Sequence, residues 1–208
     1  MEHLYCFEKP PLLIVISGTS GAGKDSVVKA LAHRMESLGR PIHFVVTANS
    51  RAPRADEVDG VDYTFVSTQE FERMIANDEL LEYARVYDQY KGVPKKQVRQ
   101  AMESGKDVVM RLDVQGAAVI RALAPEVVLI FIATSSEQEL IARLKRRHTE
   151  IASQLDVRIQ TARDEMRRIA EFDYVIPNAE GKLNETVDVI VSIINAEKHR
   201  AVPRQARL

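Results

Sequence analysis

Residues 12–26 read LLIVISGTSGAGKDS, an apolar run followed at once by a glycine-rich segment. Gly18, Gly23 and Lys24 have the spacing of a phosphate-binding loop, in which glycines let backbone N–H groups point into one concavity and the lysine reaches the outer phosphates. A glycine-rich turn that only joins a strand to a helix is the alternative, but the strong apolar patterns on both sides favour a nucleotide site. The residues expected to form it are Gly18, Thr19, Ser20, Gly21, Ala22, Gly23, Lys24, Asp25 and Ser26.

Two acidic residues are candidate ligands for the Mg²⁺ that accompanies a nucleotide in such sites. Asp25 stands where these loops usually carry a Ser or Thr hydroxyl, and Mg²⁺ accepts carboxylate oxygens as well. The alternative for Asp25 is a helix-capping role, because an acid in the first turn of a helix is favoured by the helix dipole. Asp113 ends the apolar segment VVMRLD (108–113), an arrangement that places a second carboxylate beside a phosphate loop. We expect Asp25 and Asp113 to hold the metal.

Short apolar runs alternate with segments of helical periodicity over most of the chain. The runs expected as buried parallel strands are residues 12–17, 107–113, 127–134 and 174–178. Their alternation with helical segments predicts an α/β fold with a parallel central sheet. Residues 43–93 interrupt it with several short strands, which indicates a small lobe inserted between core segments 11–42 and 94–197. The basic, proline-containing tail 198–208 is expected to be disordered.

The overall composition argues against several classes of protein. The chain has 208 residues, and its net charge of −1 gives no general attraction to nucleic acid or to an anionic membrane. No apolar run is long enough to span a bilayer, and the first residues lack the features of a secretory or transit signal. The single cysteine, Cys6, fits a reducing compartment. We expect a cytoplasmic protein, monomeric or homodimeric, without nucleic-acid or membrane partners.

Two clusters of cations could serve a phosphoryl group, whose transfer depends on positioning and on charge neutralisation. Arg51 and Arg54 lie three positions apart and are followed by Tyr63; an ordinary surface loop is the alternative. Residues 140–170 carry eight Lys or Arg against four Asp or Glu.

The basic segment 140–170 has two possible interpretations. Arg143 and Arg147 share a helix face, and Arg158 follows on the next helix across a polar connector. Two helices joined in this way could form a lid that brings arginines over the phosphates and excludes water. A pair of solvated helix faces is the alternative.

The motifs together resemble those of the guanylate kinase family over residues 11–197. GTSGAGKDS (18–26) is similar to the family's phosphate loop, and SRAPRADEVDGVDYTFVS (50–67) to its GMP-phosphate segment. The segments ELLEYARVYDQYKG, GKDVVMRLDVQGA, RLKRRHT and DYVIPN follow in family order. The resemblance implies a P-loop kinase core, a GMP-binding lobe at about 43–93 and a helical lid at about 143–160. It also implies transfer of a phosphoryl group from ATP to GMP, giving ADP and GDP.

The resemblance also implies roles for individual residues. The expected catalytic residues, which neutralise the transferring phosphoryl group, are Lys24, Arg54, Arg147 and Arg158. The expected GMP-binding residues are Thr47, Arg51, Arg54, Tyr63, Glu82, Lys91 and Asp113. Among these, Glu82 corresponds to the acid that reads guanine, and Asp113 to a second acid near the base and the metal.

Several residues depart from the family pattern. Asp25 replaces a serine, Arg111 an acid, and Val93 a serine that contacts guanine. Lys91 stands where a phosphate-binding tyrosine is usual, and it can serve a phosphate as a point charge. Several of these changes are similar to the plant organellar branch of guanylate kinases and therefore indicate a subtype.

Two other functions are alternatives to GMP phosphorylation. A related P-loop kinase for another phosphorylated acceptor, such as ribose 1,5-bisphosphate, also carries a GKDS-type loop, but it would not need guanine-reading acids. A non-catalytic guanylate-kinase-like module that binds phosphopeptides would have lost much of the loop and lid chemistry. Because Lys24, Arg147 and Arg158 are all present, we expect an active kinase.

Overall fold

The core of the protein is a five-stranded parallel sheet in the order β2-β7-β1-β8-β9. The computed structural model describes residues 9–54, 57–86, 89–146 and 152–206. The core strands are β1 (Leu13–Gly18), β2 (His43–Phe44), β7 (Val108–Arg111), β8 (Val128–Ala133) and β9 (Tyr174–Pro177). Because β1 and β8 are buried along their whole length, both are continuous apolar runs. The predicted α/β fold with a parallel central sheet is confirmed.

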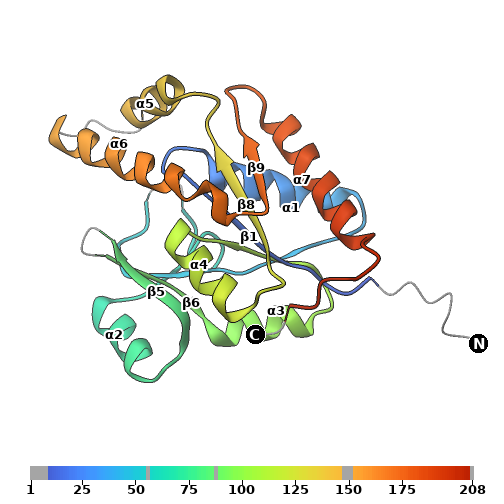
Figure 1. Cartoon of the computed structure of the whole chain (residues 1–208). Helices are drawn as coiled ribbons and strands as arrows, with labels where there is room; N and C mark the ends of the chain where they lie inside the picture. The colour runs from blue at the N-terminus through green and yellow to red at the C-terminus, as the bar shows by residue number, and fades with distance from the viewer. Residues whose placement is uncertain (1–8, 55–56, 87–88, 147–151, 207–208) are drawn as a thin grey trace, which may run out of the picture.

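Helices cover both faces of this sheet (Figure 1). One face carries α1 (Lys24–Ser37) and α7 (Leu183–Lys198), and the other carries α3 (Lys95–Glu103) and α4 (Val114–Leu123). Successive residues of β1 point to opposite faces, so Ile14 packs with α1 and α7 while Leu13 packs with α3 and α4. Among the described residues, no helix combines the length and the apolar character that a membrane span needs.

A second sheet lies beside the core, in the order β4-β3-β6-β5. Its elements are β3 (Ala48–Asn49), β4 (Thr64–Phe65), β5 (Leu80–Val86), β6 (Gln89–Pro94) and the covering helix α2 (Thr68–Ala76). A small separate core holds this sheet to α2, with Phe71 fully buried and stacked on Tyr90 at a ring-centroid distance of 5.2 Å. Leu80 and Met74 complete it, so the second sheet has its own apolar support.

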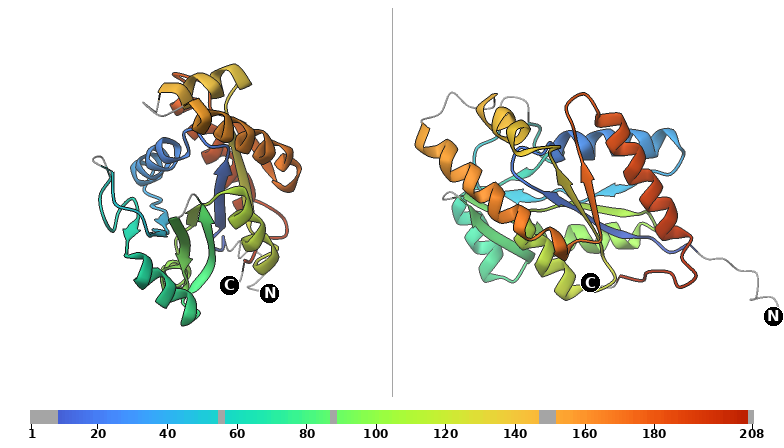
Figure 2. Two further views of the ribbon diagram at one scale, coloured as in Figure 1. Left: turned by 90° about the vertical axis from the view of Figure 1, so that its left-hand side faces the viewer. Right: turned by 45° about the horizontal axis from the view of Figure 1, so that its top comes forward.

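Helices α5 (Glu137–Arg146) and α6 (Ala152–Arg167) pack against each other at one end of the molecule. Figure 2 shows the pair lying at the same end as the turn between β1 and α1. Leu140, Leu144 and Ala162 are buried between the two helices. A short 3₁₀ turn, Ile169–Glu171, follows α6 and leads into β9. The α5–α6 pair is therefore a separate packing unit on the core.

The carboxyl-terminal segment differs from the expected disordered tail. Lys198 ends α7, and residues 199–206 lie along the core. Arg204 donates hydrogen bonds to Glu197 (2.9 Å) and to the carbonyl of Val127 (3.3 Å). Glu197 is buried and also accepts a hydrogen bond from the Tyr174 hydroxyl (2.6 Å). The prediction of a disordered tail is therefore wrong for residues 199–206, because a buried carboxylate needs the cation that the tail supplies.

Replacing Arg204 with alanine is expected to lower the free energy of unfolding by about 1–3 kcal/mol, since the buried Glu197 loses a charged partner. Chemical denaturation measures the change. Arg200 is the matched control, because it is half-exposed and lies 3.7 Å from the same carboxylate. Arg200→Ala is expected to change stability by less than about 0.5 kcal/mol. Equal effects of the two substitutions would contradict a specific role for Arg204.

Candidate active site

The loop between β1 and α1 is shaped by glycines. Gly18, Gly21 and Gly23 have φ angles of 138°, 88° and 86°. A Cβ atom on Gly18 would come within 2.0 Å of the Ile132 carbonyl oxygen, so no other residue fits between β1 and β8 at this point. Gly23 precedes the first residue of α1 and has no side chain to cap it. The first backbone N–H groups of α1 therefore form an anion-binding helix end.

Lys24, the first residue of α1, folds back over this loop. Its Nζ donates to the carbonyl oxygens of Gly18 (2.6 Å) and Thr19 (2.9 Å). Burial lowers the pKa of Lys24, while the charges of Glu165 and Asp25 counteract that effect. An ammonium held by neutral carbonyls in a buried position is a strong partner for an added anion.

The α5–α6 pair contacts the same loop. Arg158 on α6 donates to the Ser20 hydroxyl (3.3 Å), and Glu165 accepts a hydrogen bond from the Ser20 backbone N–H (2.9 Å). Burial raises the pKa of Glu165, and the charge of Lys24 opposes that rise. The structure thus brings Arg158 to the phosphate loop as expected, whereas Arg147 lies outside the described residues. Glu165 is a contact that the sequence analysis missed.

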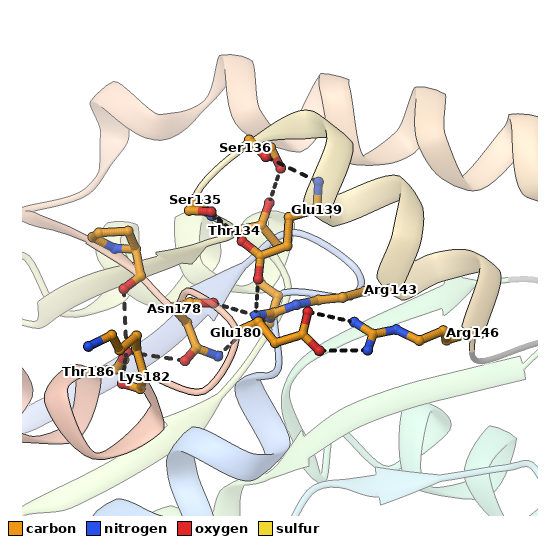
Figure 3. A network of polar contacts seen from close by, with 12 residues as sticks. Thr134, Ser135, Ser136, Glu139, Arg143, Arg146, Asn178, Glu180, Lys182 and Thr186 are labelled. Carbon is orange, nitrogen blue, oxygen red and sulfur yellow. Dashed lines mark hydrogen bonds and ion pairs between the residues drawn. The ribbon is translucent and has the colours of Figure 1, made fainter.

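Arg143 on α5 connects the loop to the residue after β9, as Figure 3 shows. Its guanidinium donates to the carbonyl oxygens of Ala22 (3.3 Å) and Asn178 (2.7 Å), and it pairs with Glu139 (2.5 Å). The Asn178 side chain also donates to Ala22 O (2.8 Å). Sequence reasoning placed Arg143 on the correct helix but gave no role to Asn178. Asn178 could have been identified from its position directly after the last core strand, because the carboxyl ends of parallel strands carry ligand contacts.

A cavity of about 380 Å³ opens beside this network. Its lining residues are Gly21, Gly23, Ser26, Arg143, Arg146, Asn178, Ala179, Glu180, Gly181 and Leu183. The ion pair between Arg146 and Glu180 (2.6 Å) belongs to the same lining (Figure 3). The volume is in the range of small-molecule sites, and the cavity touches the phosphate loop.

Arg51 and Arg54, which follow β3 in the chain, share one carboxylate. Arg51 makes two hydrogen bonds to Glu57 (2.6 and 2.5 Å), and the more exposed Arg54 lies 3.6 Å from it. The Arg51 guanidinium also lies 5.3 Å from the centre of the Tyr63 ring. The hydrogen bond from Arg51 lowers the pKa of Glu57. Two arginines and one carboxylate leave an excess positive charge for a phosphate.

Lys91 lies near this cluster, on β6 opposite Asn49 of β3. Burial lowers the pKa of Lys91, and the positive charge of Arg51 lowers it further. Thr47 is buried just before β3, and its carbonyl accepts the N–H of Thr64. Lys91 therefore adds a cation beside Arg51, and the roles of Lys91 and Thr47 stay predictions.

Glu82 and Asp113 meet at the amino end of α4. Asp113 caps this helix, and its Oδ1 accepts the N–H groups of Gln115 and Gly116 (both 2.9 Å). The Glu82 carboxylate lies so close to Gly116 that a Cβ there would approach it to 3.1 Å. Burial and the negative charge of Asp113 raise the pKa of Glu82 to about 7. The pair forms a half-buried acceptor site for N–H groups.

Comparison with known proteins assigns the chain. A family model described as guanylate kinase matches residues 11–197. The chain belongs to the guanylate kinase family. Guanylate kinase 2, chloroplastic/mitochondrial, of Oryza sativa subsp. japonica is 48% identical over 199 residues, covering 95% of this chain and 68% of the relative. A guanylate kinase of Latilactobacillus sakei is 44% identical over 193 residues, covering 93% and 92%.

Solved structures agree with this assignment. The crystal structure of guanylate kinase from Anaplasma phagocytophilum superposes with a TM-score of 0.75 at 29% identity, covering 93% of this chain and 89% of that one. The resemblance drawn from the motifs, including the one to plant organellar guanylate kinases, is confirmed.

Two of the residues that the sequence analysis sets apart, Asp25 and Arg111, are in contact. Asp25 is the second residue of α1, after Gly23 at the cap position, and its Oδ1 pairs with Arg111 Nη1 at 2.8 Å. The Asp25 side chain is 43% exposed, whereas that of Arg111 is 7% exposed. Both residues stand out in the sequence, but no local sequence pattern predicts that they form an ion pair.

Mg²⁺ fits the carboxylates of this site, because its preferred partners are one or two carboxylates together with substrate phosphates and water. Within the described residues, no group of three or more His, Cys, Asp or Glu side chains could hold a metal without such help. Since Asp25 pairs with Arg111 and Asp113 accepts two backbone N–H groups, both carboxylates are oriented by neighbours. Asp25 and Asp113 are therefore the residues that would hold Mg²⁺ together with the phosphates of a bound nucleotide.

Proposed function

We propose that this member of the guanylate kinase family transfers the γ-phosphoryl group of ATP to GMP and releases ADP and GDP. The observation that carries the choice of acceptor is the pair of carboxyl groups, Glu82 and Asp113, which meet against Gly116. Guanine presents an N1–H and an N2 amino group on one edge, and two carboxylates accept both. A ribose bisphosphate or a phosphopeptide has no matching edge.

The nucleotide loop is the proposed ATP site. Residues 18–26 present the amino end of α1 to the phosphates, and Lys24 exchanges its contacts with Gly18 O and Thr19 O for phosphate oxygens. The cavity beside Arg143 and Asn178 receives the adenine. Mg²⁺, held near Asp25 and Asp113, supplies further neutralisation of phosphate charge when it is bound with ATP.

The arginine cluster is the proposed site of the GMP phosphate. Arg51, Arg54, Tyr63 and Lys91 hold the phosphate that attacks, and Glu82 and Asp113 hold the base, with Thr47 nearby. Transfer then requires little covalent chemistry from the protein, because alignment and charge neutralisation supply most of the rate. Lys24 and Arg54 act from the two sides of the transferring group, and Arg147 and Arg158 cover it from a lid at about 143–160.

The identity of the products tests this function directly. Purified protein is incubated with ATP, Mg²⁺ and an equimolar mixture of GMP and ribose 1,5-bisphosphate, and the nucleotides are separated by chromatography. We expect GDP and ADP in a one-to-one ratio. ADP formed without GDP would contradict the assignment of the acceptor, and no ADP at all would contradict a kinase.

The raised pKa of Glu82 predicts how GMP binding depends on pH. The Glu82 carboxyl is neutral below a pH of about 7, and the two carboxylates accept both guanine N–H groups only when Glu82 is ionised above that pH. The KM for GMP is therefore expected to fall about tenfold between pH 6 and pH 8. Glu82→Gln is the control, since it keeps the titration of the GMP phosphate and removes that of Glu82. If the KM for GMP changed as steeply with pH in Glu82→Gln as in the wild type, this assignment to Glu82 would be contradicted.

Arg158 is expected to act mainly during transfer. Replacing it with methionine should lower kcat by about 10²–10³-fold, the range for one lost charge-stabilising donor, and raise the KM for GMP less than about threefold. Arg163 on the same helix is the control, because it is 52% exposed and pairs with Glu137. Arg163→Met should leave both constants near wild type. A KM effect as large as the kcat effect would place Arg158 in a static binding site.

A further inference from the structure

Arg111 is a buried arginine at the carboxyl end of β7. Its Nη1 lies 2.8 Å from Asp25 Oδ1, and its Nη2 donates to the Asp62 carbonyl at 3.0 Å. The guanidinium also lies 4.6 Å from the centre of the Tyr63 ring and 5.6 Å from that of Phe44. One side chain of the central sheet therefore contacts α1, β2 and the segment that precedes β4.

Two of these contacts belong to residues with proposed roles in catalysis. Asp25 follows Lys24 in the first turn of α1 and is a proposed contact of the metal. Tyr63 is a proposed ligand of the GMP phosphate, and its ring lies near Arg51 as well as Arg111. Arg111 thus stands between the phosphate-donor side and the phosphate-acceptor side of the site.

The segment that carries Tyr63 has a second attachment to the core. The Asp62 carboxylate pairs with Lys29 on α1 at 2.6 Å, while the Asp62 carbonyl accepts from Arg111. Lys29 is 56% exposed and Arg111 is 7% exposed. Solvent reaches the Lys29–Asp62 pair only at its lysine end, because the Asp62 side chain is 7% exposed. The buried Arg111 guanidinium contacts both the Asp62 carbonyl and the Tyr63 ring, so it is the attachment that also reaches the ring of Tyr63.

We propose that Arg111 is a positioning residue for phosphoryl transfer, because one guanidinium orients the Asp25 carboxylate and the Tyr63 ring at the same time. The proposal rests on the proposed function. Phosphate loops usually carry a Ser or Thr hydroxyl at the position of Asp25, and the charge of this acid meets that of Arg111 at 2.8 Å. The guanidinium on β7 therefore balances the charge that Asp25 brings into the loop.

Arg111→Met is the first test, since methionine keeps an apolar stem beside Phe44 and removes every polar contact. The affinity for GMP, measured by calorimetry without ATP or Mg²⁺, is expected to fall about tenfold, the size of a partly desolvated cation–π contact together with lost order in Tyr63. The Mg²⁺ concentration for half-maximal rate is expected to rise about fivefold or more as Asp25 loses its orientation. Unchanged values for both quantities would overturn the proposal.

A double-mutant cycle isolates the Asp25 contact. Asp25→Ala alone should raise the Mg²⁺ requirement, and the same change in Arg111→Met should add less than about twofold, because the two residues act as a unit. Lys29→Met is the matched control: it cuts the other attachment of Asp62 and should leave the Mg²⁺ requirement within about twofold of wild type. Additive effects in the cycle, or an equal effect of Lys29→Met, would reduce Arg111 to a structural role and overturn the proposal.

Arg111→Lys serves if the methionine variant does not fold. A lysine keeps a cation for Asp25 but lacks the planar guanidinium fork that lies over the Tyr63 ring, so Mg²⁺ dependence should stay near wild type while GMP affinity falls. The reverse pattern would overturn the proposal. Wild-type protein in the same assays separates the proposed function from the role of Arg111. If the wild type fails to make GDP, the proposed function is contradicted. If the wild type makes GDP and the Arg111 variants keep its GMP affinity and Mg²⁺ requirement, only the role of Arg111 is contradicted.

Discussion

Replacing Lys24 with alanine is expected to lower kcat by at least ~10³-fold. The Nζ of Lys24 lies at the carbonyl oxygens of Gly18 and Thr19, where it meets the phosphates that the loop binds. Because the transferring group carries charge on three oxygens throughout the reaction, a missing ammonium raises the barrier rather than only weakening binding. Initial rates at saturating ATP and GMP measure the effect.

The same substitution is expected to leave the fold intact. Burial lowers the pKa of Lys24, so the folded protein holds the charged form of this side chain at a cost, and removing it does not destabilise the core. Lys95→Ala is the control. Lys95 is the first residue of α3 and pairs with Asp78, so this variant should keep normal turnover. A folded Lys24→Ala variant with near-normal kcat would show that the loop does not bind the transferring phosphates.

Local patterns predicted the core of the fold. β1 and β8 are continuous apolar runs because helices cover both of their faces, and the glycines after β1 mark a turn that larger residues cannot form. The second sheet was predicted as an inserted lobe, because several short strands at residues 43–93 interrupt the alternation of strands and helices. The bounds of its strands came only from the structure. The tail was misjudged because its composition suggests disorder, while a single residue, Arg204, meets a buried carboxylate on α7.

The site was predictable where a motif carries it and was missed where distant segments meet. Lys24, Arg51 and Glu82 came from motifs, whereas Glu165 reaches Ser20 across 145 positions of sequence. Arg143 and Asn178 likewise meet at Ala22 from separate elements. No periodicity encodes such contacts, because they depend on how α5 and α6 pack on the core.

Selection of GMP over AMP is expected to be about 10⁴-fold in kcat/KM, as for sites that pair a polar group which the analogue lacks. Glu82 and Asp113 accept two N–H groups from guanine, whereas adenine presents the lone pair of N1 to the same carboxylates. Each unpaired buried group costs about 1–3 kcal/mol. The ratio should narrow below a pH of about 7, because a protonated Glu82 can donate a hydrogen bond to adenine N1.

The most direct test of the account is therefore kcat/KM for GMP and for AMP, measured with ATP and Mg²⁺ at pH 8, where Glu82 is ionised. We expect a ratio of roughly 10⁴ in favour of GMP, and a large fall of that ratio in Glu82→Gln with the KM for ATP nearly unchanged. Comparable values of kcat/KM for GMP and AMP in the wild-type protein would contradict it.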